Sequence, residues 1–263
     1  MRDLTTISDR LERFTKSPQP NEALILARFH SDTREYLEAV RFYSQAAKLG
    51  PSGSYDYSFE IFSNMANAAW NDIIGFDEVI PSADAILQAR PRNANHVIKT
   101  ASTITRLARK HMRTKEIAIY LQAGLDVTAN SEKKSMIDSR HLFMADYTLC
   151  ITGDTAKALR IKKASMDDGW DNDRDQFFAF SKWCLERKIN LVEAKHFARR
   201  TIPLVYPGKF RAKIYNTLSD ICLAQENRSE AIAMMQLAVQ EEPENDYYYE
   251  LLDKLQNEEK TEP

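Results

Sequence analysis

Five histidines and three cysteines are the residues best suited to catalysis or metal binding, and none is spaced for either. The histidines are His30, His96, His111, His141 and His196, and the cysteines are Cys150, Cys184 and Cys222. The sequence contains no HExxH motif, no CxxC pair and no close His/Cys pair with metal-ligand spacing. An odd number of cysteines argues against a disulfide framework. Because each cysteine lies in an apolar, helix-like segment, we expect reduced thiols buried as small hydrophobic groups.

One pairing stays open for catalysis, because Cys184 and His196 fall on adjacent predicted helices of one hairpin. Such a pair makes a cysteine nucleophile, whereas a cysteine inside a packed helix is usually inert. The sequence also lacks the glycine-rich phosphate loops and the GxSxG nucleophile elbow. The acidic stretch 167–176, DDGWDNDRDQ, lacks the ligand order of a calcium loop, and its Asp and Asn residues are typical of helix caps. We therefore predict no catalytic residue, no metal site and no cofactor.

Residues 106–115, RLARKHMRTK, form the one dense basic stretch. It is interpreted as a solvated helix end, where positive charge is favourable, with a patch for an acidic partner and a nucleic-acid contact as alternatives. The net charge of −2 predicts no general attraction to nucleic acid or to an anionic membrane. No apolar run is long enough to suggest membrane insertion, and the first residues lack the apolar core of a signal peptide. These features predict a cytoplasmic location.

Small and apolar residues recur with helical spacing, which predicts the elements that would carry any site. In 38–51, EAVRFYSQAAKLGP, one helical face is formed by Ala39, Phe42, Tyr43, Ala46 and Leu49. The preceding stretch 22–30 is a second apolar helix, and the polar residues 31–35 separate the two, as in a helix hairpin. Short side chains let the two helices approach closely, and Pro51 ends the second helix.

The same pattern returns near the C-terminus, where 230–243 reads EAIAMMQLAVQEEP. Both regions resemble the tetratricopeptide repeat, a 34-residue pair of antiparallel helices. The small residues and closing proline of the first repeat are Ala27, Ala39, Ala46 and Pro51, and those of the last are Ser219, Ala231, Ala238 and Pro243. The resemblance implies an all-α, right-handed α-solenoid. Between these repeats, Ala158 and Ala194 take the place of Ala231, with a few extra residues that fit in the turns.

We predict about six tetratricopeptide-like hairpins between two flanking helices. The predicted segments are 1–19, an N-terminal helix and linker; 20–245, the solenoid, with hairpins near 20–53, 54–92, 93–130, 139–172, 175–208 and 212–245; 246–258, a C-terminal helix; and 259–263, a tail. The hairpin at 54–92 is the most divergent, because Pro81 falls near the start of its second helix.

Residues 20–258, most clearly 142–250, are also similar to the helical-repeat half of bacterial proteins that join a thioredoxin-like domain to tetratricopeptide repeats. This resemblance rests on the stretches Ala145-Asp146-Tyr147, GDTAKALRIKKASMDDGW and FAFSKWCLERKINLVEAKHFARR. This chain has no thioredoxin domain, and Trp183-Cys184 is not followed by a second cysteine. The resemblance therefore implies no redox residue here, and at most an accessory role beside a thioredoxin-like protein.

In a tetratricopeptide array the first helices line a concave groove. Counting back from the alanines of the second helices places the groove residues at Arg140, Phe143, Tyr147, Gln176, Trp183, Lys213, Asn216 and Asp220, with Ala179 and Glu186 between them. Their mix of aromatic, charged and amide groups suits an extended or helical peptide. Phe143 and Trp183 either bind a partner or pack between neighbouring repeats. The first hairpin supplies Asn21, Leu24 and Arg28, which do not match the Lys/Asn set of chaperone-tail-binding repeats.

The sequence thus favours a non-catalytic scaffold that binds a protein or peptide partner, with no nucleic acid and no membrane insertion. A sensor that binds a small ligand or peptide is the alternative, and an enzyme with an unrecognised site is the third. The sequence does not indicate the oligomeric state or the identity of the partner.

Overall fold

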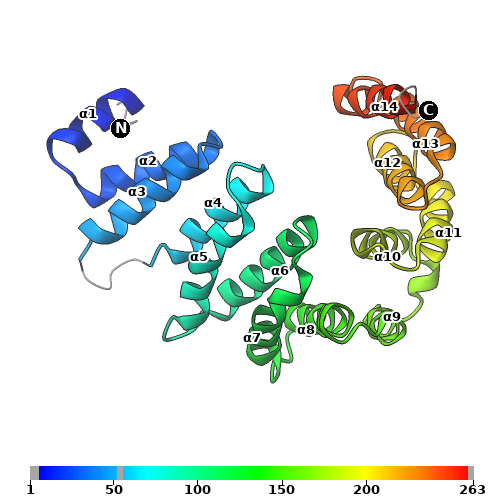
Figure 1. Ribbon diagram of the computed structural model, residues 1–263, viewed down its shortest axis with the longest axis horizontal. Coiled ribbons are helices and arrows are strands. Elements are labelled where there is room, and N and C mark those ends of the chain that lie inside the picture. The colour runs from blue at the N-terminus through cyan, green and yellow to red at the C-terminus, as the bar shows by residue number, and fades with distance from the viewer. Residues whose placement is uncertain (1–5, 52–55, 260–263) are drawn as a thin grey trace. The chain divides into compact units, whose positions relative to one another are not determined.

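The computed structural model describes residues 6–51 and 56–259, and these residues form helices and no strands. They divide into two compact units, residues 1–162 and 163–263. The helices of the N-terminal unit are α1 (Ile7–Lys16), α2 (Pro20–Asp32), α3 (Tyr36–Leu49), α4 (Ser58–Trp70), α5 (Phe76–Gln88), α6 (Ala94–Lys110), α7 (Ala118–Thr128) and α8 (Lys134–Tyr147). Those of the C-terminal unit are α10 (Arg174–Arg187), α11 (Leu191–Thr201), α12 (Lys209–Ala224), α13 (Arg228–Glu241) and α14 (Asp246–Glu259), and α9 (Thr155–Ala164) crosses the division (Figure 1).

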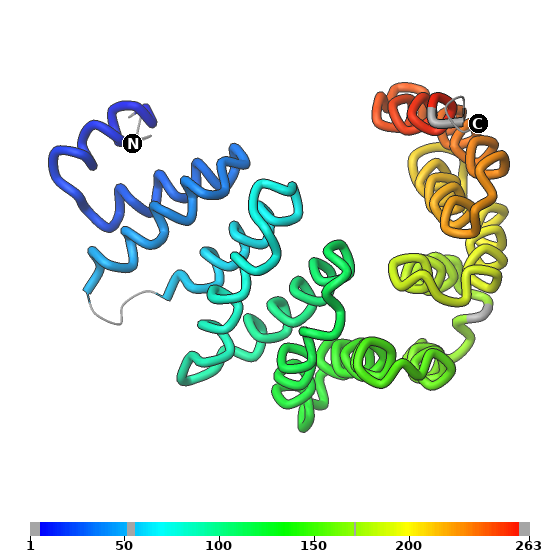
Figure 2. The backbone as a smooth tube through the Cα atoms, in the orientation of Figure 1, coloured from blue at the N-terminus to red at the C-terminus, as the bar shows by residue number. Residues whose placement is uncertain are grey.

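Consecutive helices pack as hairpins within each unit, as the small residues predict. Helices α2 and α3 lie side by side (Figure 2), and Ala27 and Ala39 at their contact are fully buried. In the C-terminal unit α12 and α13 form the same closely packed pair, and Ala231 is fully buried there. A larger side chain at these positions has no free volume, because protein interiors are packed as densely as organic crystals.

Side-chain caps fix where several helices begin. Thr6 accepts a hydrogen bond from the backbone of Asp9 at 3.1 Å, and the Asp9 carboxylate accepts one from the Thr6 backbone at 3.2 Å. Asn93 and Asn227 likewise accept hydrogen bonds from the first turns of α6 and α13. Each cap satisfies backbone N–H groups that have no partner within the helix.

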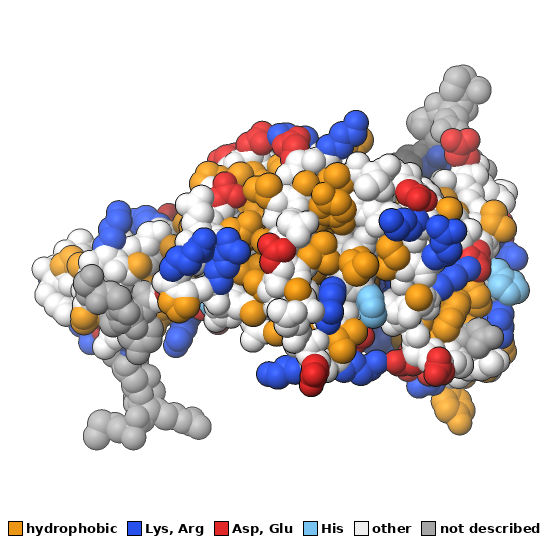
Figure 3. Space-filling model, turned by 90° about the horizontal axis from the view of Figure 1, so that it is seen from below, with side chains coloured by type: hydrophobic (Ala, Val, Ile, Leu, Met, Phe, Trp, Pro, Cys, Tyr) orange, Lys and Arg blue, Asp and Glu red, His pale blue; other side chains and the backbone are white. Residues whose placement is uncertain are grey.

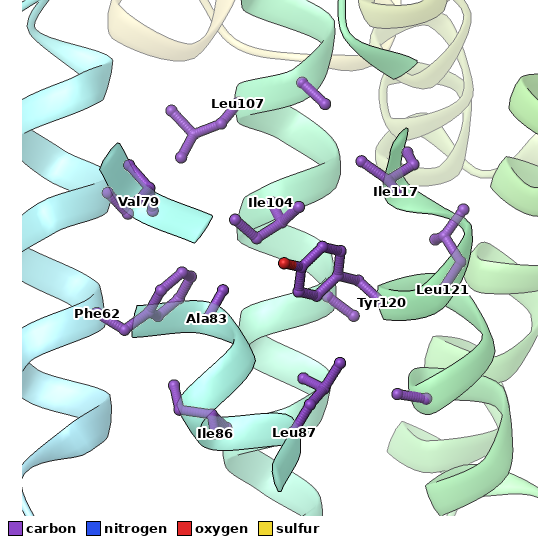
Figure 4. Packing of buried hydrophobic residues seen from close by; sticks show 14 of the residues in the cluster. Phe62, Val79, Ala83, Ile86, Leu87, Ile104, Leu107, Ile117, Tyr120 and Leu121 are labelled. Carbon is purple, nitrogen blue, oxygen red and sulfur yellow. The ribbon is translucent and has the colours of Figure 1, made fainter. Parts of the chain in front are cut away.

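The largest core of the N-terminal unit lies between α4, α5, α6 and α7. Phe62, Val79, Ile104 and Tyr120 meet there and are almost completely buried (Figure 4). The Tyr120 hydroxyl donates a hydrogen bond of 2.6 Å to Asp84, so the polar end of this buried ring is satisfied. Burial, followed by that hydrogen bond, raises the pKa of Tyr120 well above its usual value.

The hairpin predicted at 139–172 is less regular than the others. Helix α8 packs closely on α7, and Ala158 is the one buried residue of α9. Between them a π-helix, Thr148–Thr152, extends α8. A π-helical turn accommodates one inserted residue, which accounts for part of the extra length of this repeat.

Candidate functional site

The cysteines and histidines are not clustered as metal ligands among the described residues. No group of three His, Cys, Asp or Glu side chains within 6–51 and 56–259 is arranged to hold a metal ion. Cys184 and Cys222 are fully buried and form no disulfide, as predicted, whereas Cys150 is only half-buried and differs from that expectation. Burial raises the pKa of the Cys222 thiol. His196 is exposed, whereas Cys184 has no accessible surface, so this pair does not present a nucleophile to substrate.

Residues of the acidic and basic stretches contact other residues of the same chain. Asp173 accepts hydrogen bonds from the backbone of Asp175 and Gln176 at 2.8 and 2.9 Å, so it caps α10 as expected. In the basic stretch, Lys110 lies 5.6 Å from the centre of the Trp70 ring and donates to Asp72 at 2.7 Å. Arg113 likewise binds Asp77 through two hydrogen bonds of 2.9 and 3.2 Å and also contacts Glu116. These contacts favour a structural role over a docking patch.

Two equivalent hydrogen bonds fix the register of the two regular hairpins in the C-terminal unit. The Ser181 hydroxyl of α10 donates to the Ala194 carbonyl of α11 at 2.8 Å. The Ser219 hydroxyl of α12 donates to the Ala231 carbonyl of α13, also at 2.8 Å. All four residues are fully buried, so Ser181 and Ser219 are structurally equivalent.

This equivalence corrects the sequence register of α10 by one residue. Ser181 precedes Ala194 by 13 positions, whereas Ser219 precedes Ala231 by 12. The turn after α10 has two residues with left-handed backbone, Lys188 (φ 51°) and Asn190 (φ 48°), whereas the turn after α12 has one, Glu226 (φ 60°). The extra residue is therefore accommodated in the first of these turns, and counting back from Ala194 misplaces every residue of α10 by one.

In the corrected register Trp183 matches Ile221, and not Asp220. Both positions are buried, at 5% and 0% exposed. The Trp183 ring contacts the Phe180 ring and lies 4.5 Å beneath the Arg187 guanidinium. Trp183 thus offers almost no surface to a partner, which favours its packing role. Gln176 is half-buried, and its side-chain oxygen accepts a hydrogen bond of 3.1 Å from the Asp167 backbone.

The corrected register defines one polar face, here named the α10–α12 face. Its members are Asp175, Phe178 and Lys182 on α10 and Lys213, Asn216 and Asp220 on α12. Residues three and four apart lie on one side of a helix, and α10 packs against α12. Except for the buried Phe178 and half-buried Asn216, all of these side chains are exposed. The predicted residues Lys213, Asn216 and Asp220 are therefore brought together, whereas Gln176 and Trp183 lie off this face.

The predicted residues of the N-terminal unit have structural contacts. Arg140 donates to the Ala129 and Ser131 carbonyls at 2.8 and 3.0 Å, which satisfies backbone oxygens beyond the end of α7. Phe143 is 3% exposed and packs directly on Gly124, where a Cβ atom would lie 2.6 Å from its ring. Tyr147 is half-buried against the largest core. Phe143 therefore has no free surface for a partner, which favours its packing role.

Carboxylates along the second helices of the C-terminal unit are paired. Lys163 donates to Glu193 at 2.6 Å, and both Lys195 and Arg199 bind Glu230. Glu193 and Glu230 each directly precede the alanine at the helix contact, so this pairing repeats with the hairpins. The hydrogen bond from Lys195 holds the pKa of Glu230 below its usual value.

The α10–α12 face contrasts with this pairing. Asp220 forms no hydrogen bond or ion pair with the described residues, and burial raises the pKa of its carboxyl to about 6. Water nevertheless reaches the side chain. Its carboxylate can therefore accept a hydrogen bond from solvent or from a partner. One turn earlier, the Asn216 Oδ1 atom is buried without a hydrogen-bond partner among the described residues, as is the Trp183 Nε1 atom.

A hollow of about 350 Å³ opens at the N-terminal ends of α10 and α12. It is lined by Arg174, Asp175, Val205, Tyr206, Pro207 and Phe210. Phe210 packs edge-on against Phe178 with ring centres 5.4 Å apart, so the hollow adjoins the α10–α12 face. Tyr206 is 90% exposed at its rim. Sequence reasoning missed this hollow because the turn 202–208 carries no repeat signal.

One solved structure is similar to this chain in fold. A tetratricopeptide repeat protein from Parabacteroides merdae ATCC 43184 superposes with a TM-score of 0.60 and 14% identity, covering 95% of this chain and 91% of that one. YrrB, described as a tetratricopeptide protein with an unusual peptide-binding site, matches at 13% identity and TM-score 0.34, covering 94% and 98% of the two chains. The tetratricopeptide TPR2AB domain of yeast Sti1, in its pHSP90 complex, matches at 16% identity and TM-score 0.35, covering 90% and 83%. No protein-family model and no curated protein matches the chain.

The predicted fold class is therefore confirmed: the chain is an all-α protein of tetratricopeptide-like helical hairpins. The similarity to thioredoxin-fusion proteins stays a prediction. None of the described helices is long and apolar enough to cross a bilayer. On the face drawn in Figure 3, basic side chains lie in small groups among hydrophobic and acidic ones.

Proposed function

We propose that the α10–α12 face binds a segment of a partner protein and that the chain is a non-catalytic interaction scaffold. The unsatisfied polar groups of this face carry the proposal. Asp220 and the Asn216 Oδ1 atom have no partner among the described residues, whereas Glu193 and Glu230 on the second helices are paired. The exposed Asp220 carboxylate has no partner among the described residues and is open to hydrogen-bond donors that a bound peptide would supply.

Peptide binding is better supported than small-ligand sensing. The hollow at the ends of α10 and α12 has about 350 Å³ and lies at the lower end of the range for small-molecule sites. It also continues into an exposed polar face through Phe178 and Phe210. An extended chain would use both features, whereas a compact ligand would use only the hollow. A scaffold beside a thioredoxin-like protein remains one form of this proposal.

Selection of short random peptides on the full-length chain tests the proposal. Peptides that bind should lose about tenfold or more in affinity with Lys213→Ala or Asn216→Ala, measured by fluorescence anisotropy. Gln240→Ala on the exposed side of α13 is the matched control and should leave affinity unchanged. Peptides that bind the two variants and the control equally would show that partners dock elsewhere.

A further inference from the structure

The α10–α12 face and the hollow together set the chemistry of a partner. Both lie along α12, which runs without interruption from Lys209 to Ala224. Phe210, in the wall of the hollow, precedes Asp220 by ten residues of this helix. At 1.5 Å per residue the two positions are about 15 Å apart along the helix axis.

Asp220 is suited to a cationic group. Its carboxylate accepts hydrogen bonds only, and it has no partner among the described side chains. Lys182, its counterpart on α10, has its ammonium 6.0 Å from the Phe178 ring centre and forms no ion pair there. The Asn216 Oδ1 atom one turn earlier is buried, so the exposed Asp220 carboxylate is the acceptor that a partner reaches. Its two oxygens match the several N–H donors of a lysine or arginine side chain.

The hollow is suited to an apolar group. Val205, Pro207, Tyr206 and Phe210 supply apolar surface around most of it. Val205 is buried in the wall of the hollow, whereas Tyr206 is almost fully exposed at its rim. Pockets of this kind receive the large apolar anchors that dominate binding energy in interfaces.

We propose that the partner segment is extended and places a basic side chain on Asp220 and a large apolar side chain in the hollow, roughly four to five residues apart. The spacing follows from dividing the separation of about 15 Å by about 3.3 Å per extended residue. This inference rests on the proposed function of the α10–α12 face and adds the chemistry and register of the partner.

A set of peptides with one fixed phenylalanine tests the spacing. Each peptide carries a single lysine, moved one position at a time from the phenylalanine, in an otherwise Gly/Ser/Thr sequence that is acetylated and amidated. Binding to the full-length chain should peak at a separation of four or five residues. Asp220→Asn should weaken the best peptide by about tenfold or more, since the lost contact is a charge-assisted hydrogen bond. It should leave a norleucine-for-lysine peptide unchanged.

Variants of the hollow and a remote carboxylate complete the experiment. Phe210→Ala should weaken binding of the phenylalanine peptides, and Tyr206→Ala gives the same test at a side chain that is 90% exposed and not needed for folding. Glu244→Gln, an exposed carboxylate between α13 and α14, is the control for Asp220→Asn.

The outcomes separate this inference from the proposed function. A peak at the expected spacing that Asp220→Asn abolishes supports both. Binding that depends on Lys213 and Asn216 but is indifferent to the lysine position and to Asp220→Asn overturns the partner chemistry and leaves the scaffold proposal standing. Binding that no variant on α10 or α12 changes overturns both.

Discussion

The two sides of the hairpins in the C-terminal unit differ in how completely their polar groups are satisfied. Along the second helices, Glu193 and Glu230 are bound by lysine or arginine side chains. Along the first helices, Asp220 and the Asn216 Oδ1 atom are left without partners among the described residues. Paired groups stabilise the stacking of repeats, whereas unpaired, desolvated groups cost stability. Under the proposed function, the second helices hold the unit together and the first helices supply the binding face.

Trp183→Ala should cause the largest loss of stability. It tests whether Trp183 packs within the unit or belongs to the binding face. Its ring is 5% exposed and packs on Phe180 and Arg187. Removing a buried aromatic side chain should lower the free energy of unfolding by about 3–5 kcal/mol. Peptide affinity of the remaining folded protein should be unchanged. Urea unfolding and anisotropy on the same sample measure both, and a large affinity loss with little stability loss would return Trp183 to the binding face.

Ala231→Leu tests the helix contact within the last hairpin. Ala231 is fully buried, and its carbonyl accepts the Ser219 hydrogen bond, so the two helices cannot separate without losing that bond. Overpacking should lower the free energy of unfolding by about 1–3 kcal/mol. Ala233→Leu, at an exposed position of α13, is the matched control. An unchanged denaturant midpoint for Ala231→Leu would contradict the close approach.

The small residues and the hairpins could be predicted from the sequence because they depend on local spacing. Ala27, Ala39 and Ala231 are buried where helical periodicity places them. The partners of the basic stretch could not be predicted, because Arg113 meets Asp77 across 36 residues of chain. Such contacts depend on how whole helices pack, which periodicity does not specify.

The correct register of α10 could have been found from a second sequence motif. The motif Ser-x-x-Cys occurs as SKWC from Ser181 and as SDIC from Ser219. Aligning the two places Trp183 opposite Ile221, which is how the structure has them. The side of a helix changes by about 100° per residue, so a shift of one residue replaces a face-lining position by a buried one.

Glu230→Gln removes one of the paired carboxylates of the second helices and should have a smaller effect on stability. Glu230 accepts from Lys195, Arg199 and Asn227, and only the first of these is well shielded from solvent. Losing the charge should lower the free energy of unfolding by about 1 kcal/mol at neutral pH, since partly exposed pairs are screened. The pKa of Glu230 is lowered in the folded state, so its contribution is present above the ordinary glutamate pKa and is lost as pH falls below it. Denaturation at neutral and acid pH measures the difference.

Asp220→Asn should have the smallest effect on stability, and it should raise the stability and not lower it. Burial raises the pKa of Asp220 from 3.8 to about 6, so the folded state disfavours the charged form. Between these two values the folded protein binds more protons than the unfolded chain, and its stability therefore falls as pH rises through this window. Well above pH 6 the full cost is present, and it is small because the exposed Asp220 side chain is screened by solvent. The asparagine variant, which carries no charge, should therefore have a slightly higher denaturant midpoint than the unmodified chain. Well below pH 3.8 Asp220 is protonated in both the folded and the unfolded protein, and the difference from the asparagine variant should vanish. A variant that is less stable at pH 8 would show that Asp220 belongs with the paired carboxylates and not with the binding face.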